Sequence, residues 1–129
     1  MNEVGIYNLE KIKSKYKERL RKAKLYYNLI ENNVAFKIEC FSNENALLEY
    51  PVILKKINNQ IAHERLMNLG FDIRHTWYLN NAKYENFFVP EQFKDTCFIE
   101  DRIFCLPIHE NISENDIKKI SSIINSFDC

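Results

Sequence analysis

The chain contains very little glycine, since Gly5 and Gly70 are the only two in 129 residues. The P-loop, the dinucleotide-binding G-x-G-x-x-G turn and the G-x-S-x-G turn of serine hydrolases each need at least two glycines at short spacing. Gly5 and Gly70 lie far apart in the sequence. These phosphate-binding and nucleophile-bearing motifs are therefore excluded.

The sequence also lacks net charge and long apolar runs. Eighteen basic residues balance eighteen acidic ones, so no global positive field attracts nucleic acid or an anionic membrane. No stretch approaches the roughly 20 apolar residues that span a bilayer, and the first residues lack the pattern of a signal peptide. We expect a cytoplasmic protein with no nucleic-acid or membrane partner.

A basic run from Lys11 to Lys24 leaves nucleic-acid binding open as a weaker alternative. Its cationic side chains surround the predicted helix instead of forming one stripe, which favours an ordinary solvated helix surface.

Metal-binding patterns are missing as well. The four cysteines form no C-x-x-C pair, and no histidine is spaced to complete a zinc site. We expect Cys40, Cys97 and Cys105 to be reduced thiols, packed in the interior as small apolar residues. The sequence predicts neither a metal nor a cofactor held by this chain.

What the chain does contain is enough to fold. Hydrophobic residues make up 46% of it and charged residues 28%, a globular composition at the length of one domain. No repeat or linker divides the sequence. We predict a single domain over residues 1–129, with a long helix at about 8–31 and an α+β body at about 34–127.

The first helix is predicted from apolar residues at steps of three and four, with Asn8 as its N-cap. The apolar stripe consists of Leu9, Ile12, Tyr16, Leu20, Ala23, Tyr27 and Ile30. The opposite, solvated face consists of Lys11, Lys15, Glu18, Arg19, Lys22 and Lys24.

Alternating patterns predict four strands, at residues 34–41, 47–55, 71–78 and 103–108. The first should turn Phe36, Ile38 and Cys40 inward. Pro51 cannot donate to a ladder, so the second strand should be an edge strand or contain a bulge. Residues 79–96 have no period and are expected to be irregular, with a short turn at 97–102.

Two further helices complete the pattern, one at about 57–69 and one that begins after Ser113. Gly70 should end the earlier helix in a left-handed cap, and Ser113 and Asp116 have the spacing of a helix cap. The expected buried positions are Ile57, Ile61, Leu66 and Leu69 in the earlier helix and Ile117, Ile120, Ile124 and Phe127 in the later one.

The order of these elements lacks strict βαβ alternation. It predicts an α+β fold, a small and mostly antiparallel sheet with helices packed on one face.

The candidate site residues lie near two strand ends. Arg74, His75, Trp77 and Tyr78 form the densest polar and aromatic cluster, in which an aromatic ring could stack on a ligand and Arg74 could meet an anion. The alternative is that the aromatic residues are core packing and Arg74 a surface ion pair. His109 follows the last apolar strand, although a lone histidine there is more often structural.

Four segments, taken in order, resemble the C-terminal small domain of DegT-type sugar aminotransferases, which are pyridoxal-phosphate-dependent enzymes of fold type I. The segments are the helix at residues 5–31, Tyr50-Pro51-Val52, the run from Leu66 through Gly70 and Ile73 to Trp77 and Tyr78, and Cys105–His109 with Ile112 and Asp116–Ile120. The sequence departs from the family pattern at residues 79–83.

The resemblance implies the C-terminal portion of an enzyme that moves an amino group from glutamate to a nucleotide-linked keto-sugar, usually as a dimer. Arg74, His75, Trp77, Tyr78 and His109 would line the substrate site, with no catalytic or cofactor-binding residue in this chain. The Schiff-base lysine and pyridoxal phosphate would belong to a large domain, on the same or a separate chain, that precedes Gly5. We expect the isolated chain to be inactive.

A second hypothesis remains open beside this one. The chain could be a free-standing α+β module, derived from the same family, that binds a protein or a nucleotide-sugar and has no enzymatic activity.

Overall fold

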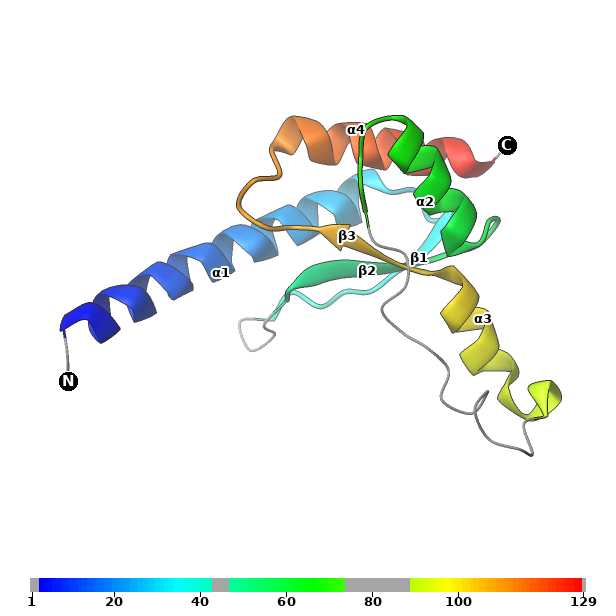
Figure 1. Cartoon of the computed structure of the whole chain (residues 1–129), viewed down its shortest axis with the longest axis horizontal. Helices are drawn as coiled ribbons and strands as arrows, with labels where there is room; N and C mark the ends of the chain where they lie inside the picture. The colour runs from blue at the N-terminus through cyan, green and yellow to red at the C-terminus, as the bar shows by residue number, and fades with distance from the viewer. Residues whose placement is uncertain (1–2, 43–46, 74–88, 129) are drawn as a thin grey trace.

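The computed structural model describes residues 3–42, 47–73 and 89–128. The helices and strands are α1 (Glu3–Leu29), β1 (Ala35–Lys37), β2 (Glu49–Leu54), α2 (Asn59–Asn68), the 3-10 helix η2 (Pro90–Phe93), α3 (Lys94–Arg102), β3 (Ile103–Pro107), α4 (Glu114–Asn125) and the 3-10 helix η3 (Ser126–Asp128). The strands form an antiparallel sheet in the order β1-β2-β3. Figure 1 shows α1, α2 and α4 over one face of it and α3 extending beyond its end. The predicted α+β class is confirmed.

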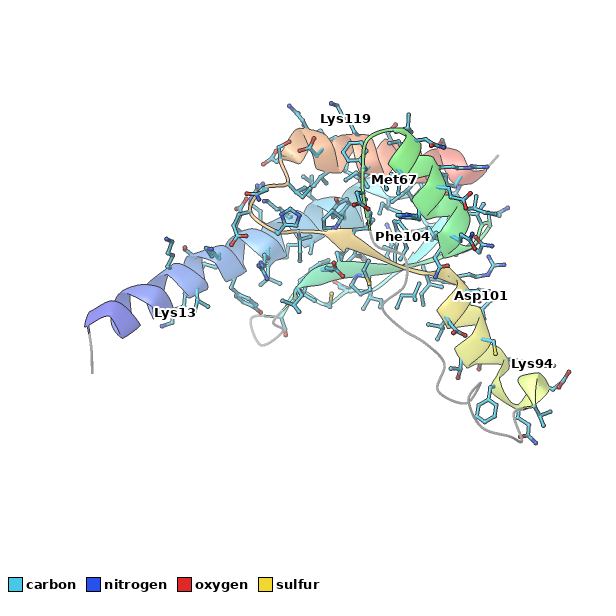
Figure 2. All side chains as sticks on the ribbon, viewed as in Figure 1. Lys13, Met67, Lys94, Asp101, Phe104 and Lys119 are labelled. Atoms are coloured by element: carbon cyan, nitrogen blue, oxygen red, sulfur yellow. The ribbon has the colours of Figure 1, made fainter. Side chains whose placement is uncertain are left out.

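The core lies between this sheet and the helices. Alternation along β2 sends Tyr50, Val52 and Leu54 toward the helices, where all three are fully buried. On β3, Phe104 points into the same layer (Figure 2) and is fully buried. The apolar stripe predicted for the last helix meets them, since Ile117, Ile120, Ile124 and Phe127 are all buried.

The buried residues at this side of the core lie in the C-terminal half of α1 and directly after its end. Leu20, Ala23 and Tyr26 are buried, as is Ile30, one residue beyond the helix, and the ring of Tyr26 stacks on that of Tyr50 with centroids 6.2 Å apart. Ile12, which the periodicity placed inward, is 60% exposed. The N-terminal half of the helix projects away from the body (Figure 1). The helix also begins at Glu3, before the predicted cap at Asn8.

α1 and α4 lie side by side and run in the same direction (Figure 1). Asn125, near the end of α4, accepts a hydrogen bond from the Glu31 N–H at 3.0 Å and donates one to the Leu29 carbonyl at 2.9 Å. At the other end of α4, Ser113 and Asp116 form the predicted capping box. The two helices are thus joined at the C-terminal end of α1 by a single amide side chain.

The prediction for β1 was wrong in both length and orientation. The strand has three residues, and Phe36 and Ile38 are 52% and 42% exposed instead of buried. The cause is Lys37, whose ammonium donates to the carbonyls of Tyr27 and Ile30, each at 2.7 Å. A cation at the C-terminal end of a helix is favoured by the exposed carbonyls there, and this contact turns the neighbouring Phe36 outward.

Pro51 was predicted to mark an edge or a bulge, but β2 is the central strand. β1 pairs with Leu54, Ile53 and Val52 of β2 and stops there, so it does not reach Pro51, while β3 pairs through Pro51 opposite Cys105. Pro51 has no N–H to donate, and it is tolerated in the central strand because β1 does not pair with β2 at this residue.

The middle of the chain departs further from expectation. Ala62 and Leu66 are the buried residues of α2, whereas Ile61 is 40% and Leu69 61% exposed. Residues 71–73 are not in a strand, and the rest of that predicted strand lies outside the described residues. Part of the stretch expected to be irregular is helical, since η2 and α3 occupy residues 90–102. Periodicity missed α3 because this helix has no buried residue.

Gly70 ends α2 as predicted. Its φ is +88°, the Phe71 N–H donates to the Leu66 carbonyl at 2.9 Å, and the Gly70 N–H donates to the Met67 carbonyl at 3.0 Å. These two bonds are those of a Schellman cap.

Replacing Gly70 with alanine should lower the free energy of unfolding by about 1–2 kcal/mol, the penalty of a left-handed L-residue. A Cβ at this position meets nothing within 4 Å, so the cost comes from the backbone alone. Urea denaturation of the wild type, Gly70→Ala and Gly70→Asn measures the change in the free energy of unfolding. Asparagine tolerates this conformation better, so an equal loss in both variants would contradict the explanation.

Candidate functional site

Of the five predicted site residues, the structure describes His109 only. Arg74, His75, Trp77 and Tyr78 lie outside the described residues. His109 is exposed in the turn that connects β3 to α4, residues 108–113, which we call the His109 turn. His63, expected on the surface, is instead half-buried, with its Nδ1 2.6 Å from the Ile73 carbonyl oxygen.

The His109 turn is fixed to α1 by a buried lysine. Lys22 was predicted on the solvated face, yet it is 4% exposed. Its ammonium donates to the backbone carbonyls of His109 at 2.7 Å and Glu110 at 3.4 Å. A buried ammonium without such acceptors would be very costly, so the carbonyls of the turn and the lysine hold one another in place.

Two cations of α1 face the side chain of Glu110. Lys15 Nζ lies 2.8 Å from Oε1, and Arg19 Nη2 lies 3.9 Å from Oε2. The Nε–H of Arg19 is buried and has no hydrogen-bond partner among the described residues. The hydrogen bond from Lys15, followed by the backbone hydrogen bond and the positive charges, lowers the pKa of Glu110 to about 2.

These three charged residues line a pocket of about 280 Å³ together with apolar side chains. The rest of its wall consists of Ile12, Tyr16, Leu47 and Leu48. We call it the Glu110 pocket. Tyr16 donates its hydroxyl to the Ser42 carbonyl at 3.2 Å, which connects α1 to the segment before β2. A second hollow, beside Leu69, Phe71 and Lys119, has a single charged side chain and so offers less to orient a ligand.

Arg21, two residues beyond Arg19, is held by carboxylates of this chain. It donates to Glu18 at 2.9 and 2.7 Å and pairs with Glu114 on α4. Lys22 likewise donates to backbone carbonyls of this chain, so two cations of the basic run in α1 form bonds within the fold.

The three described cysteines are free thiols. Cys105 alone is buried, whereas Cys40 and Cys97 are half-buried, so the prediction of three buried thiols was wrong for two of them. Burial, with the nearby charge of Glu49, raises the pKa of Cys105 to about 11, which keeps it a thiol at neutral pH. Within the described ranges, no three His, Cys, Asp or Glu side chains are placed to bind a metal ion.

None of the helices in the described part of the chain combines the length and apolar character needed to cross a membrane.

Comparison with solved structures relates this architecture to an enzyme. The chain superposes on the crystal structure of the sugar aminotransferase CalS13 from Micromonospora echinospora with a TM-score of 0.68, covering 95% of this chain. This chain shares its fold with part of a sugar aminotransferase. The sequences are 17% identical, so the similarity establishes the fold alone, and the chain spans 33% of the length of CalS13.

Sequence comparisons add nothing to this relationship. No protein-family model matches the chain, and none of the curated proteins searched matches it.

The described residues do not fit covalent binding of pyridoxal phosphate. Lys22 is the buried lysine of the described part, and its ammonium is engaged by two carbonyls. A Schiff-base lysine needs a neutral amine that is free to react, commonly favoured by apolar surroundings. No reaction step through this cofactor is therefore assigned to the described residues.

Sequence reasoning missed the Glu110 pocket. Lys15 and Arg19 looked like solvated charges, and Glu110 lies more than 90 residues away in the chain. No local period links positions this far apart. The one available signal was the S-x-x-D cap at Ser113, which fixes where the turn before α4 must lie.

The carboxyl group of Glu110 should titrate near pH 2 in the folded chain, well below its ordinary value of 4.5. A lowered pKa means that the ion pair is present at neutral pH and is lost as the pH falls through about 2. Carbon-detected NMR of the glutamate carboxyl groups measures this titration. Lys15→Gln should raise the pKa toward its ordinary value, and a wild-type value near 4.5 would contradict the geometry.

Proposed function

We propose that this chain is the C-terminal portion of a pyridoxal-phosphate-dependent nucleotide-sugar aminotransferase of the DegT type, fold type I. The observation that carries the proposal is the superposition of 95% of the chain on one third of CalS13. The order of four family-like segments in the sequence supports it. In the complete enzyme, glutamate would supply the amino group and a keto-sugar nucleotide would accept it.

In this proposal the chain forms part of the substrate wall and a large domain supplies the cofactor chemistry. His109, on its lysine-fixed turn, is the described member of that wall. Arg74, His75, Trp77 and Tyr78 are proposed as its other members on the basis of the sequence alone. The large domain would lie on the same or a separate chain, and the assembled enzyme would be a dimer.

A candidate surface for that large domain is provided by η2 and α3. Val89, Phe93, Phe98 and Ile99 are between 36% and 41% exposed, and α3 has no buried residue. The helix extends away from the body, with Lys94 near its outer end (Figures 1 and 2). A helix with exposed apolar side chains and no buried ones is better explained by a partner than by the core of this chain.

Mixing this chain with the large domain encoded in frame before it, or by an adjacent gene, should give a stable complex with transaminase activity toward a keto-sugar nucleotide. Size-exclusion chromatography with light scattering measures the complex, and glutamate consumption measures the activity. A well-folded mixture that neither associates nor reacts would count against the proposal.

A matched pair of substitutions tests the α3 surface in the same assay. Ile99→Ser should raise the Kd of the complex about tenfold, as expected for removing an apolar side chain from an interface. Asp101→Ser, an exposed polar position on the same helix, serves as the control. Equal effects of the two substitutions would remove α3 from the docking surface.

The second candidate is a free-standing binding module without enzymatic activity. The continuous core of helices and sheet and the Glu110 pocket favour this alternative, since the described residues of this chain form both without a second domain. Titration with nucleotide-sugars, followed by the fluorescence of Trp77, the single tryptophan, should then give a saturable change. The absence of any change at millimolar ligand would remove nucleotide-sugar binding near Trp77.

A further inference from the structure

The Glu110 pocket contains more positive charge than its one carboxylate satisfies. Lys15 makes a close contact at 2.8 Å, but Arg19 Nη2 stands 3.9 Å from the other oxygen, beyond hydrogen-bond distance. The buried Nε–H of Arg19 has no partner among the described residues. A guanidinium presents parallel N–H donors that can bind both oxygens of one carboxylate. The carboxylate of Glu110 does not bind Arg19 in this way.

The backbone that holds Glu110 is itself fixed by a third cation. Lys22 is buried directly behind the turn and bonded to the carbonyls of His109 and Glu110. The side chain of Glu110, by contrast, is 43% exposed. It can therefore rotate away from the pocket without disturbing the turn, and the two cations that line the pocket, Lys15 and Arg19, would then face a vacated anion position.

The remaining wall of the pocket is apolar. Ile12 and Leu48 are 60% and 77% exposed, and Leu47 lies beside them. Exposed aliphatic side chains next to unsatisfied cations suit a ligand that is anionic at one end and aliphatic at the other. The volume of about 280 Å³ limits that ligand to a small molecule.

We propose that the Glu110 pocket binds a small organic carboxylate with a short aliphatic group, and that Glu110 occupies the anion position when no ligand is bound. The ligand carboxylate lies between Lys15 and Arg19 and accepts hydrogen bonds from the free N–H donors of the Arg19 guanidinium. The aliphatic group covers Ile12 and Leu48. Inorganic phosphate satisfies the cations but leaves these apolar side chains exposed, so it should bind more weakly.

This inference does not rest on the proposed function. Every residue it uses lies in the described part of this chain, none of the residues that line the pocket belongs to the predicted substrate wall, and binding is measured without a large domain or a cofactor.

The test uses 4-methylpentanoate as the probe, with its neutral amide and inorganic phosphate as comparisons. Amide chemical shifts of residues 12–19, 48 and 110 should change saturably with the acid, with a Kd of about 1 mM expected from its few heavy atoms. The amide and phosphate should each bind at least about tenfold more weakly. Equal binding of either one would overturn the proposal, as would the absence of saturation with the acid.

Substitutions distinguish a ligand site from a structural ion pair. Glu110→Gln removes the competing carboxylate and should tighten binding of the acid about threefold or more, whereas Arg19→Gln should weaken it about tenfold. Lys17→Gln removes the same charge from an exposed position of α1 outside the pocket and should leave the Kd unchanged. Unchanged or weaker binding in Glu110→Gln would show that Glu110 supports the ligand position instead of occupying it, and would overturn the proposal.

Discussion

The fold depends on burial of one half of one helix. Tyr26 of α1 and Ile30, directly after the helix, are buried in this layer, where the ring of Tyr26 stacks on that of Tyr50 of β2. An aromatic pair of this kind combines a large buried area with a preferred geometry. Lys22, Lys37 and Asn125 then connect the same half of α1 to the His109 turn, to β1 and to α4. Lys37 and Asn125 donate to backbone carbonyls at the C-terminal end of α1, so these polar groups are satisfied where the apolar stripe is buried, whereas Lys22 donates to the carbonyls of the His109 turn.

The features that could be predicted from the sequence are those with a local signal. The capping box at Ser113, the left-handed Gly70 and the buried stripe of α4 each depend on residues a few positions apart, and all three are confirmed. The errors come from contacts between distant segments. Lys37 reverses the faces of β1 by bonding to the end of α1, and the truncation of β1 lets Pro51 sit in a central strand. The Glu110 pocket joins α1 to a turn far along the chain, which no periodicity can reveal.

The chain has two exposed surfaces of different character. At one end, η2 and α3 present exposed aliphatic and aromatic side chains, among them Phe98, over whose ring Arg102 lies at 4.9 Å. At the other, the N-terminal half of α1 combines aliphatic side chains with cations that face one carboxylate. The first composition suits a protein interface and the second a small anionic ligand. The Nε–H of Arg19, unsatisfied among the described residues, lies at the second surface.

The bond between Asn125 and the end of α1 has a consequence for synthesis on the ribosome. The helix that Asn125 completes is made well before its core partners in β3 and α4. Contacts between such distant parts of a chain close slowly because a long loop must be ordered first. The apolar side chains of α1 that face α4 must therefore wait unburied until α4 emerges, and during this interval a chaperone would have the greatest effect on the yield of folded protein.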